Sequence, residues 1–262
     1  MITVITISYN AFNDIEKTIR SVLDQKNVNF EYIIIDGKSS DGTIDIIKKY
    51  DNCITKWLSE PDSGIYNAMN KGVSLATGDF CIFMNAGDCF VDDNVLFNVS
   101  RILEDKYDIY NGNSFFVDDN NKIVCYERCR KNYPLKHFYK DSICHQATFI
   151  KTELLRKYPY DESLRMVSDW KFWLQMICFE KAKFKGINVD ICCFNMNGIT
   201  NNQKEKGQKE RQKVLTDLFT SKELETMEKR SWFHKNIVRV YKGIIRRFWK
   251  FYASYFKQYK YL

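Results

Sequence analysis

The side chains best suited to chemistry lie in four short polar clusters within the first 90 residues. The clusters are Ser8-Tyr9-Asn10, residues 36–43, residues 60–71 and Asn85-Ala86-Gly87-Asp88. Their carboxylates can bind cations or accept protons, and their hydroxyl and amide groups can make directional hydrogen bonds to a ligand. One cluster alone says little, because an Asp-Gly pair after a strand usually makes only a turn. The order and spacing of all four together carry the interpretation.

Alternating strand and helix signals predict the elements that position these clusters. Apolar runs predict strands at residues 2–7, 32–35, 54–58 and 80–84. Helical spacing of apolar residues predicts helices at residues 15–23, 43–50 and 64–76, with Asn13 or Asp14 available to cap the first. This alternation implies an α/β fold with an open, mostly parallel sheet and helices on both faces. Ligands of such sheets bind at the carboxyl ends of the strands, which is where the clusters lie.

The second half of the chain shows a looser pattern. Periodicity predicts a helix near residues 93–105 and another at residues 167–179, with one apolar stripe that contains Trp170 and Trp173. Extended segments are predicted at residues 109–116, 123–126 and 147–150. We expect this half to extend the first sheet and not to form an independent domain.

Composition and charge separate a globular body from a basic tail. The chain has 262 residues, is 45% hydrophobic and 15% aromatic, and contains only three prolines, which predicts a compact interior. Residues 229–262 contain ten Lys or Arg and no Asp or Glu, so residues 1–228 have a net charge of −3 within the total of +7. The positive charge therefore belongs to the tail and indicates an anionic partner there.

The pattern of the tail predicts an amphipathic helix. From Phe233 onward, apolar residues recur every three or four positions and basic residues fall between them. A basic face opposite Trp, Phe, Tyr and Ile favours binding in the plane of an anionic membrane surface. The alternatives are a helix packed on the body with a solvated basic face, or pairing of two tails in a homo-oligomer. No nucleic-acid partner is expected, because the body is mildly acidic and contains no recognised nucleic-acid module.

Cysteine usage and the N-terminus indicate a cytoplasmic protein. The nine cysteines are odd in number and scattered, which favours reduced, partly buried thiols. A zinc site from Cys125, Cys129, His137 and Cys144 matches no compact metal module and is set aside. The chain starts with an apolar strand and no basic leader, and no apolar run reaches the roughly 20 residues that span a bilayer. We expect a cytoplasmic location, with the tail on the inner face of the membrane.

Together the four clusters resemble the family 2 nucleotide-sugar glycosyltransferases of the GT-A fold, bacterial enzymes that assemble surface polysaccharides. The resemblance runs through residues 4–10 (VITISYN), 35–43 (IDGKSSDGT), 60–72 (EPDSGIYNAMNKG) and 85–88 (NAGD). Beyond these segments it is looser and rests on His145-Gln146, Ser168-Asp169-Trp170 and Asn197-Gly198-Ile199-Thr200. It implies a nucleotide-sugar donor, with a UDP-sugar favoured, and inverting transfer to a glycan or lipid-linked glycan acceptor.

The resemblance also implies a set of donor-binding residues. Asp36 is expected to accept hydrogen bonds from the base or ribose of the donor. Lys71 is expected to offer a mobile charge to a phosphate or base, the alternative being an ordinary solvated lysine. The full set is Ser8, Asn10, Asp36, Ser39, Asp62, Lys71 and Asn85.

Asp88 is the metal ligand that the resemblance implies. Related enzymes use Mn²⁺ or Mg²⁺ held by carboxylate and phosphate oxygens, because a nucleoside diphosphate is a poor leaving group until its charge is neutralised. The family motif is often richer in Asp, whereas Asn85 and Gly87 take two of its places here. We therefore expect the phosphates of the donor to dominate the coordination. The alternative is that residues 85–88 form only a turn or a helix cap.

Asp169 is the general base that the resemblance implies. Inverting transfer needs a group that takes the proton of the acceptor hydroxyl while its oxygen attacks the anomeric carbon. Asp169 opens the second predicted helix of this half, so capping of that helix by Asp169 or Ser168 is a competing interpretation. His145 and Gln146 are expected near the acceptor or the diphosphate, the alternative being a structural histidine.

These inferences define a catalytic domain at residues 1–228 and a tail at residues 229–262. Residues 1–90 are the expected nucleotide-binding half and residues 91–228 the acceptor-side half, in which residues 197–200 close over the donor unless they form an ordinary turn. A rival nucleotidyltransferase would need a glycine-rich loop after the first strand, and residues 8–13 contain no glycine. A second rival is a catalytically degenerate nucleotide-sugar or glycan-binding subunit, which the reduced cluster at residues 85–88 favours.

Overall fold

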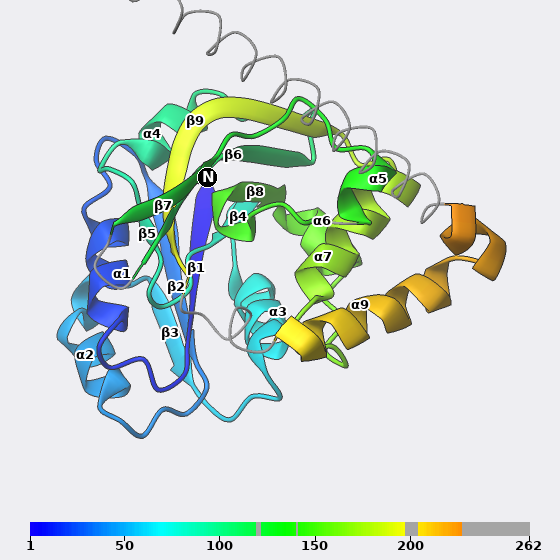
Figure 1. Ribbon diagram of the computed structural model, residues 1–262. Helices are drawn as coiled ribbons and strands as arrows, with labels where there is room; N and C mark the ends of the chain where they lie inside the picture. The colour runs from blue at the N-terminus through cyan, green and yellow to red at the C-terminus, as the bar shows by residue number, and fades with distance from the viewer. Residues whose placement is uncertain (119–121, 140, 197–203, 227–262) are drawn as a thin grey trace, which may run out of the picture. The chain divides into compact units, whose positions relative to one another are not determined.

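The computed structural model describes residues 1–118, 122–139, 141–196 and 204–226 (Figure 1). The strands are β1 (Ile2–Ser8), β2 (Phe30–Asp36), β3 (Lys56–Ser59), β4 (Phe80–Phe83), β5 (Cys89–Phe90), β6 (Ile109–Val117), β7 (Ile123–Glu127), β8 (Thr148–Lys151) and β9 (Phe184–Asn195). The α-helices are α1 (Ile15–Leu23), α2 (Thr43–Lys49), α3 (Ile65–Leu75), α4 (Val95–Ser100), α5 (Leu135–Phe138), α6 (Thr152–Lys157), α7 (Ser168–Trp173) and α9 (Lys204–Leu218). The described strands form one sheet in the order β3-β2-β1-β4-β8-β6-β9-β5, and β7 pairs with β6 beside this path.

The first four strands form the parallel half of the sheet. β1 lies between β2 and β4, and β2 pairs with β3, all in the parallel direction. The register places Ser8 of β1 opposite Asp36 of β2, and Asp36 opposite Ser59 of β3. The polar clusters that follow these strands therefore meet at one edge of the sheet, as expected for ligand sites in parallel sheets.

The second half of the chain extends the same sheet with strands of mixed direction. β8 pairs antiparallel with both β4 and β6, and β6 pairs in parallel with β9. β5 follows Asp88 directly and pairs antiparallel with the end of β9. The predicted α/β class and the single extended sheet are confirmed. The parallel pairing is confined to β1–β4 and to the β6–β9 pair, because the later strands enter the sheet from both directions.

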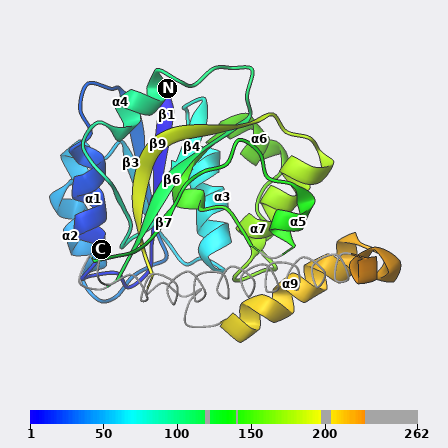
Figure 2. The ribbon, with the colours of Figure 1, turned by 45° about the horizontal axis from the view of Figure 1, so that its top comes forward.

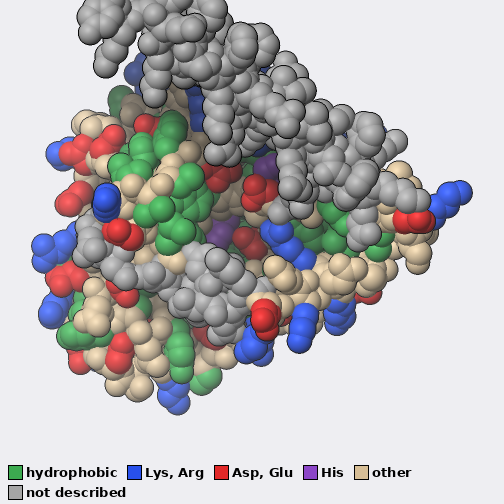
Figure 3. Space-filling view, viewed as in Figure 1, with side chains coloured by type: hydrophobic (Ala, Val, Ile, Leu, Met, Phe, Trp, Pro, Cys, Tyr) green, Lys and Arg blue, Asp and Glu red, His purple; other side chains and the backbone are tan. Residues whose placement is uncertain are grey.

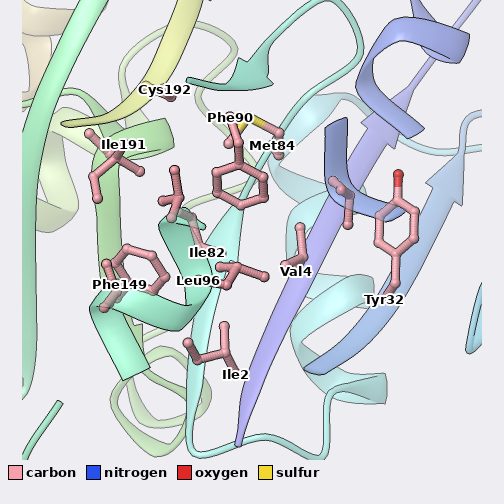
Figure 4. Close-up of a cluster of buried hydrophobic side chains, with 14 of the residues drawn as sticks. Ile2, Val4, Tyr32, Ile82, Met84, Phe90, Leu96, Phe149, Ile191 and Cys192 are labelled. Carbon is pink, nitrogen blue, oxygen red and sulfur yellow. The ribbon is translucent and has the colours of Figure 1, made fainter. Parts of the chain in front are cut away.

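Helices cover both faces of the sheet, as Figures 1 and 2 show. Successive residues of a strand point to opposite faces, so each strand contributes to two layers. Ile2 and Val4 of β1 pack in the core cluster drawn in Figure 4, together with apolar residues of α1, α2 and α4. Ile5 points to the opposite face, where it contacts α3 at Gly72. Burying a side chain of this kind contributes about 1.5–3 kcal/mol, so both layers stabilise the strands that carry the polar clusters.

Two predicted elements, one in each half of the chain, differ in extent from the observed ones. β3 begins at Lys56, two residues later than predicted, and α4 covers only Val95–Ser100 of the predicted helix at residues 93–105. The α4 helix ends early because a turn follows it, in which the Ile102 N–H donates to the Val99 carbonyl at 2.8 Å. Asp14 precedes α1, but within the described residues its side chain makes no capping hydrogen bond.

The predicted helix at residues 167–179 is continuous but changes type. α7 ends at Trp173, and a π-helical segment follows at Leu174–Phe179. At the end of the segment the Glu180 N–H donates to the Gln175 carbonyl at 2.9 Å, which is the spacing of a π-helix. Sequence periodicity cannot distinguish the two types over a single turn, because both keep Leu174 and Met176 buried.

The chain divides into two compact units, Met1–Arg211 and Gln212–Leu262. The first unit contains the whole sheet and the polar clusters. The predicted tail at residues 229–262 lies outside the described residues, so its amphipathic helix and the domain boundary at residue 228 stay predictions. Within the described part of the chain, none of the helices has the length and apolar character needed to cross a membrane.

The contact between α3 and β1 predicts that Gly72→Ala destabilises the fold. A Cβ atom at Gly72 would lie 2.5 Å from Ile5 Cγ2, inside the sheet–helix layer. We expect the free energy of unfolding, measured by urea denaturation, to fall by about 1–3 kcal/mol. Gly207→Ala on α9 is the matched control, because its Cβ atom would lie 3.7 Å from the nearest atom. The control should be neutral or stabilising by up to about 1 kcal/mol, and equal losses in both variants would contradict the packing argument.

Candidate functional site

Asp36 is the centre of a hydrogen-bond network at the carboxyl end of β2. Its carboxylate is 0% exposed and accepts hydrogen bonds from Ser8 Oγ at 3.0 Å, from Ser59 Oγ at 2.7 Å, and from the Ser39 N–H and Oγ at 2.9 and 2.5 Å. A buried carboxylate needs such donors, because an unpaired buried charge is costly. The network ties three strands together. A ligand can reach Asp36 only by replacing one of these serine hydroxyls.

The loops after β1 and β2 are bonded to each other. The Asn10 N–H donates to Ser39 Oγ at 2.8 Å, and Asn10 Oδ1 accepts from the Ser40 N–H at 3.0 Å. Asn10 has a φ of 46°, a left-handed conformation that asparagine tolerates better than most residues. The structure thus brings Ser8, Asn10, Asp36 and Ser39 into one connected group, although whether they bind a donor stays a prediction.

Asp62 and Lys71 lie beside this group but are engaged within their own segment. Asp62 Oδ1 accepts from the Gly64 N–H at 2.8 Å, and a Cβ atom at Gly37 would lie 2.6 Å from Asp62 Oδ2. Lys71 Nζ forms an ion pair with Glu60 Oε1 at 2.7 Å and donates to the Pro61 carbonyl at 3.0 Å. Lys71 is therefore held across the loop after β3, and it can reach a phosphate only when the ion pair opens.

Asp88 is buried at the start of β5, with 5% of its surface exposed. Its Oδ2 accepts from Gln146 Nε2 at 2.8 Å, and its Oδ1 accepts from the Asn195 N–H at 2.9 Å. Burial raises the pKa of Asp88 to about 6, and the hydrogen bonds from Asn195 and Gln146 only partly oppose this effect. Each carboxylate oxygen can accept a second bond. Asp88 can therefore still bind a cation or a ligand donor.

The backbone around Asp88 is fixed by Thr18 of α1. Thr18 Oγ1 accepts from the Gly87 N–H at 2.9 Å and donates to the Asp88 carbonyl at 2.7 Å. Gly87 has a φ of 100°, which a residue with a side chain rarely adopts. The glycine in the cluster at residues 85–88 is therefore required by the turn that presents Asp88.

Asn85 and His145 connect this turn to the second half of the chain. Asn85 Nδ2 and His145 Nε2 are 3.2 Å apart. Asn85 Oδ1 is a buried oxygen that has no hydrogen-bond partner among the described groups. The oxygen is therefore available to a ligand that enters beside Asp88.

Asp169 lies at the first turn of α7 and is held between two other elements. Its Oδ1 accepts from the Tyr66 hydroxyl of α3 at 2.8 Å, and its Oδ2 lies 3.3 Å from His145 Nδ1. Burial alone would raise the pKa of Asp169, but the hydrogen bond and charge of His145 and the hydrogen bond from Tyr66 lower it below its ordinary value. Burial opposes protonation of His145, yet the hydrogen bond and charge of Asp169 raise its pKa.

The contacts of Asp88 and Asp169 show which of the predicted site residues the fold brings together. The carboxylate of Asp169 bonds Tyr66 and His145 on other elements and also accepts from the backbone of Trp170. Ser168 Oγ is buried without a hydrogen-bond partner among the described groups, so Ser168 does not cap α7. Figure 3 shows acidic and histidine side chains close together in a recessed part of this face. Gln146 bonds Asp88 and His145 bonds Asp169, so two consecutive residues join the two carboxylates to one segment.

Several functional contacts were not predicted from the sequence. Tyr66 and Ser59 are the clearest, and each had a signal: Tyr66 lies inside the segment at residues 60–72, and Ser59 ends a strand beside Asp36. Thr18 and the backbone N–H of Asn195 had none, because a helix-face threonine and a main-chain donor leave no pattern in a sequence. The predicted closing segment at residues 197–200 lies outside the described residues.

The described residues offer a metal few protein ligands. Among them, no group of three or more His, Cys, Asp or Glu side chains is arranged to hold a metal ion. Asp88 and the oxygen of Asn85 are hard oxygen donors of the type that Mn²⁺ and Mg²⁺ accept. A divalent cation held at Asp88 would have to take most of its ligands from a bound diphosphate and water, because the described residues offer it so few.

Comparison with known proteins identifies relatives of the whole domain. The family model described as Glycosyl transferase family 2 matches residues 3–202. An uncharacterised glycosyltransferase of Mycobacterium tuberculosis is 30% identical over 206 residues, which are 76% of this chain and 76% of that protein. A PGL/p-HBAD biosynthesis glycosyltransferase of the same species is 26% identical over 214 residues, which are 79% of this chain and 81% of that protein.

Two solved structures have a similar fold. TarS 1-349 of S. aureus in complex with UDP-GlcNAc superposes with a TM-score of 0.62 at 18% identity, over 77% of this chain and 60% of that chain. The mannosyltransferase PcManGT of Pyrobaculum calidifontis in complex with GDP-Man and Mn²⁺ gives a TM-score of 0.56 at 17% identity, over 72% of this chain and 55% of that chain. The chain thus spans less than two thirds of either protein. At this identity the likeness concerns the fold alone, and it confirms the predicted GT-A class.

The burial of Asp88 predicts a pH-dependent gain in stability for Asp88→Asn. A carboxyl group with a raised pKa in the folded state stabilises the fold below its unfolded pKa and loses that contribution as pH rises through about 6. In EDTA, the free energy of unfolding of the variant relative to wild type should therefore increase between pH 4 and pH 7.5, by up to about 3 kcal/mol. Asp45→Asn, at an exposed carboxylate, is the control of equal charge change. Parallel pH curves for Asp88→Asn and wild type would refute the assignment.

Proposed function

Because the chain belongs to glycosyl transferase family 2, we propose that it is an inverting glycosyltransferase that transfers a sugar from a nucleotide-diphosphate sugar. A UDP-sugar is the favoured donor, and a glycan or lipid-linked glycan in surface polysaccharide biosynthesis is the favoured acceptor. The observation that carries the proposal is that two carboxylates bond two consecutive residues: Asp88 bonds Gln146, and Asp169 bonds His145. One carboxylate suits a cation on the leaving diphosphate, and the other suits the proton of the attacking hydroxyl.

Donor binding is assigned to the loops at the carboxyl ends of β1, β2 and β3. Ser8, Asn10 and Ser39 surround Asp36, and the uracil-type base of a donor would exchange one of these hydroxyl contacts for its own N–H. Tyr9 is 66% exposed and lies against Gly37, beside Asp62. The UDP-GlcNAc bound to TarS supports a uridine donor for the shared fold. Lys71 and Asn85 complete the set on the diphosphate side.

A divalent cation, Mn²⁺ or Mg²⁺, is the proposed cofactor, with Asp88 as its protein ligand. When bound, such an ion neutralises the charge of the leaving diphosphate as a Lewis acid. The Mn²⁺ in the PcManGT complex supports this choice. Asp88 contributes a carboxylate whose position is fixed by Gln146, by the backbone of Asn195 and by Thr18. The lack of further carboxylates around it among the described residues predicts weak metal binding in the absence of donor.

Asp169 is the proposed general base, and the reaction needs one proton transfer. The oxygen of the acceptor hydroxyl forms a bond to the anomeric carbon, the bond from that carbon to the diphosphate oxygen breaks, and the hydroxyl proton moves to the Asp169 carboxylate. The lowered pKa of Asp169, caused by His145 and Tyr66 against the effect of burial, keeps the carboxylate ionised and ready at neutral pH. His145 supports the base, and Gln146 holds the metal ligand.

The proposed function also assigns a role to the tail and a cellular location to the enzyme. A lipid-linked acceptor lies at a membrane, and the ten basic residues of the tail suit an anionic membrane surface on the cytoplasmic side. The name of one relative, a PGL/p-HBAD biosynthesis glycosyltransferase, supports a biosynthetic setting for the transfer. A homo-oligomer formed through the apolar face of the tail is compatible with this arrangement. A degenerate binding subunit is the second candidate, and the single carboxylate at residues 85–88 favours it.

The direct test is release of nucleoside diphosphate from a panel of nucleotide sugars with crude lipid acceptors, in Mn²⁺ or in EDTA. We expect one donor to turn over only with metal. Asp88→Ala should lose at least about 100-fold in kcat because the leaving group is no longer neutralised. Asp169→Asn should lose about 100-fold or more because the hydroxyl proton has no acceptor, with the donor still bound.

Asp161→Asn is the matched control for Asp169→Asn, because Asp161 is an ion-paired carboxylate in the segment before α7 that lies outside the proposed machinery. It should retain turnover. Donor binding detected by a thermal shift, without turnover of any panel member, would favour the binding subunit. Turnover that survives EDTA would remove the metal from the proposal, and turnover that survives Asp169→Asn would remove Asp169 as the base.

A further inference from the structure

Tyr66 joins the donor half of the site to the proposed base. It lies in the first turn of α3, only 5% of its surface is exposed, and its hydroxyl donates to Asp169 Oδ1 at 2.8 Å. The two residues are 103 positions apart in the sequence. This bond therefore exists only because the fold brings the start of α3 to the start of α7.

The bond from Tyr66 determines the direction of the Asp169 carboxylate. His145 Nδ1 approaches the other oxygen, Oδ2, at 3.3 Å. A carboxylate with a partner on each oxygen cannot rotate about its last bond without losing one of them. The backbone of Trp170 also donates to this carboxylate, and the remaining acceptor position is where the proton of an acceptor hydroxyl can arrive. Tyr66 and His145 thus act as the two fixed points of the base.

The ring of Tyr66 is held in place by its aromatic neighbours. Its centroid lies 5.6 Å from that of Tyr160, which in turn lies 5.7 Å from Phe83 and 5.4 Å from Phe172. Burial raises the pKa of Tyr66 well above its ordinary value, and the charge of Asp169 adds to this effect. The hydroxyl therefore stays protonated and remains a donor over the whole working range of pH.

We propose that Tyr66 is a positioning residue of the transferase, which orients the Asp169 carboxylate toward the acceptor hydroxyl by donating a hydrogen bond to Oδ1. This inference rests on the proposed function, in which Asp169 takes the proton. It adds a residue from the segment at residues 60–72 to the base on α7. The part of the chain that binds the donor then also orients the group that activates the acceptor.

Three other titratable groups of the described chain lie near Asp169 besides Tyr66. His145 bonds Oδ2, and Tyr160 and Arg211 lie close enough that the charge of Asp169 acts on them. Tyr160 lies in the segment between α6 and α7, and Arg211 lies on α9, above the ring of Trp170 at 4.9 Å. A change at Tyr66 leaves His145, Tyr160 and Arg211 in place, so it isolates the contribution of one hydrogen bond.

Removing the hydroxyl of Tyr66 should change the pKa of Asp169 in a known direction. The bond favours the ionised carboxylate, so its loss raises the pKa of Asp169, and the remaining effect of burial acts in the same direction. Loss of a hydrogen bond to a charged group should therefore move the pKa of Asp169 upward. The acid limb of the rate profile, which follows the protonation of the base in the free enzyme, must then move to higher pH.

The test compares Tyr66→Phe with Tyr160→Phe in the full chain. Both variants remove one hydroxyl from a buried tyrosine of the same aromatic cluster, but the Tyr160 hydroxyl has no hydrogen-bond partner among the described groups. We expect Tyr66→Phe to lower kcat about tenfold with little change in KM for the donor. We also expect its acid limb of kcat/KM to move up by about one pH unit. Tyr160→Phe should leave both quantities at the wild-type values.

A second measurement separates this inference from the proposed function. Stability that depends on ionised Asp169 is present above its unfolded pKa and is lost as pH falls through its lowered folded pKa. The loss in the free energy of unfolding between pH 6 and pH 3 should therefore be smaller in Tyr66→Phe than in wild type or Tyr160→Phe. This readout needs no turnover, so it decides the role of Tyr66 even if no donor is found.

The outcomes are distinct. A shifted acid limb and a reduced acid loss of stability in Tyr66→Phe alone support the inference. Wild-type turnover combined with an unchanged pH profile in Tyr66→Phe overturns it and leaves the transferase assignment intact. Equal effects in Tyr66→Phe and Tyr160→Phe also overturn it, because they would reflect packing of the aromatic cluster. Absence of turnover in wild type counts against the proposed function, and the stability measurement then still supports or overturns the bond to Asp169.

Discussion

The site depends on one constraint, which is that a carboxylate withdrawn from water must be given donors by the fold. Asp36 obtains them from serines on three strands, Asp88 from Gln146 and the backbone of β9, and Asp169 from Tyr66 and His145. The hydrogen bonds of each carboxylate therefore connect elements that are distant in the sequence. The loops at the edge of the sheet are ordered largely because these charges have to be satisfied.

The three carboxylates differ in how much of their bonding capacity is left. Asp36 is surrounded by hydroxyl groups and is fully buried, which suits a residue that shapes a pocket. Asp88 and Asp169 accept fewer hydrogen bonds than Asp36 and keep acceptor positions. Their pKa values move in opposite directions, since burial dominates for Asp88 and the neighbours His145 and Tyr66 dominate for Asp169. In the proposed reaction, two carboxyl groups of the same chemistry would thereby have different tasks.

Much of the framework could be predicted from the sequence, because the first half follows local rules. Apolar runs and helical periodicity located β1, β2, β4, α1 and α3, and parallel pairing then placed the clusters at one edge. The bonds made by side chains were harder to predict. Tyr66 lies inside the segment at residues 60–72 that carried the resemblance, but a sequence does not state which way a hydroxyl points. The π-helical segment after Trp173 and the backbone donor at Asn195 depend on tertiary packing, which periodicity does not encode.

The 103-residue separation between Tyr66 and Asp169 has a consequence for how the chain acquires activity. Contacts distant in sequence close large loops and form late, whereas the β1-α1-β2 unit consists of near neighbours and can form early. The loops of the first three strands can thus be ordered while the proton-accepting group still lacks its orientation. During synthesis, the chain would then pass through a stage that can hold a nucleotide sugar without consuming it. In the proposed reaction, turnover reaches its full rate only after Tyr66 has bonded Asp169, so the rate would report on the formation of this long-range contact.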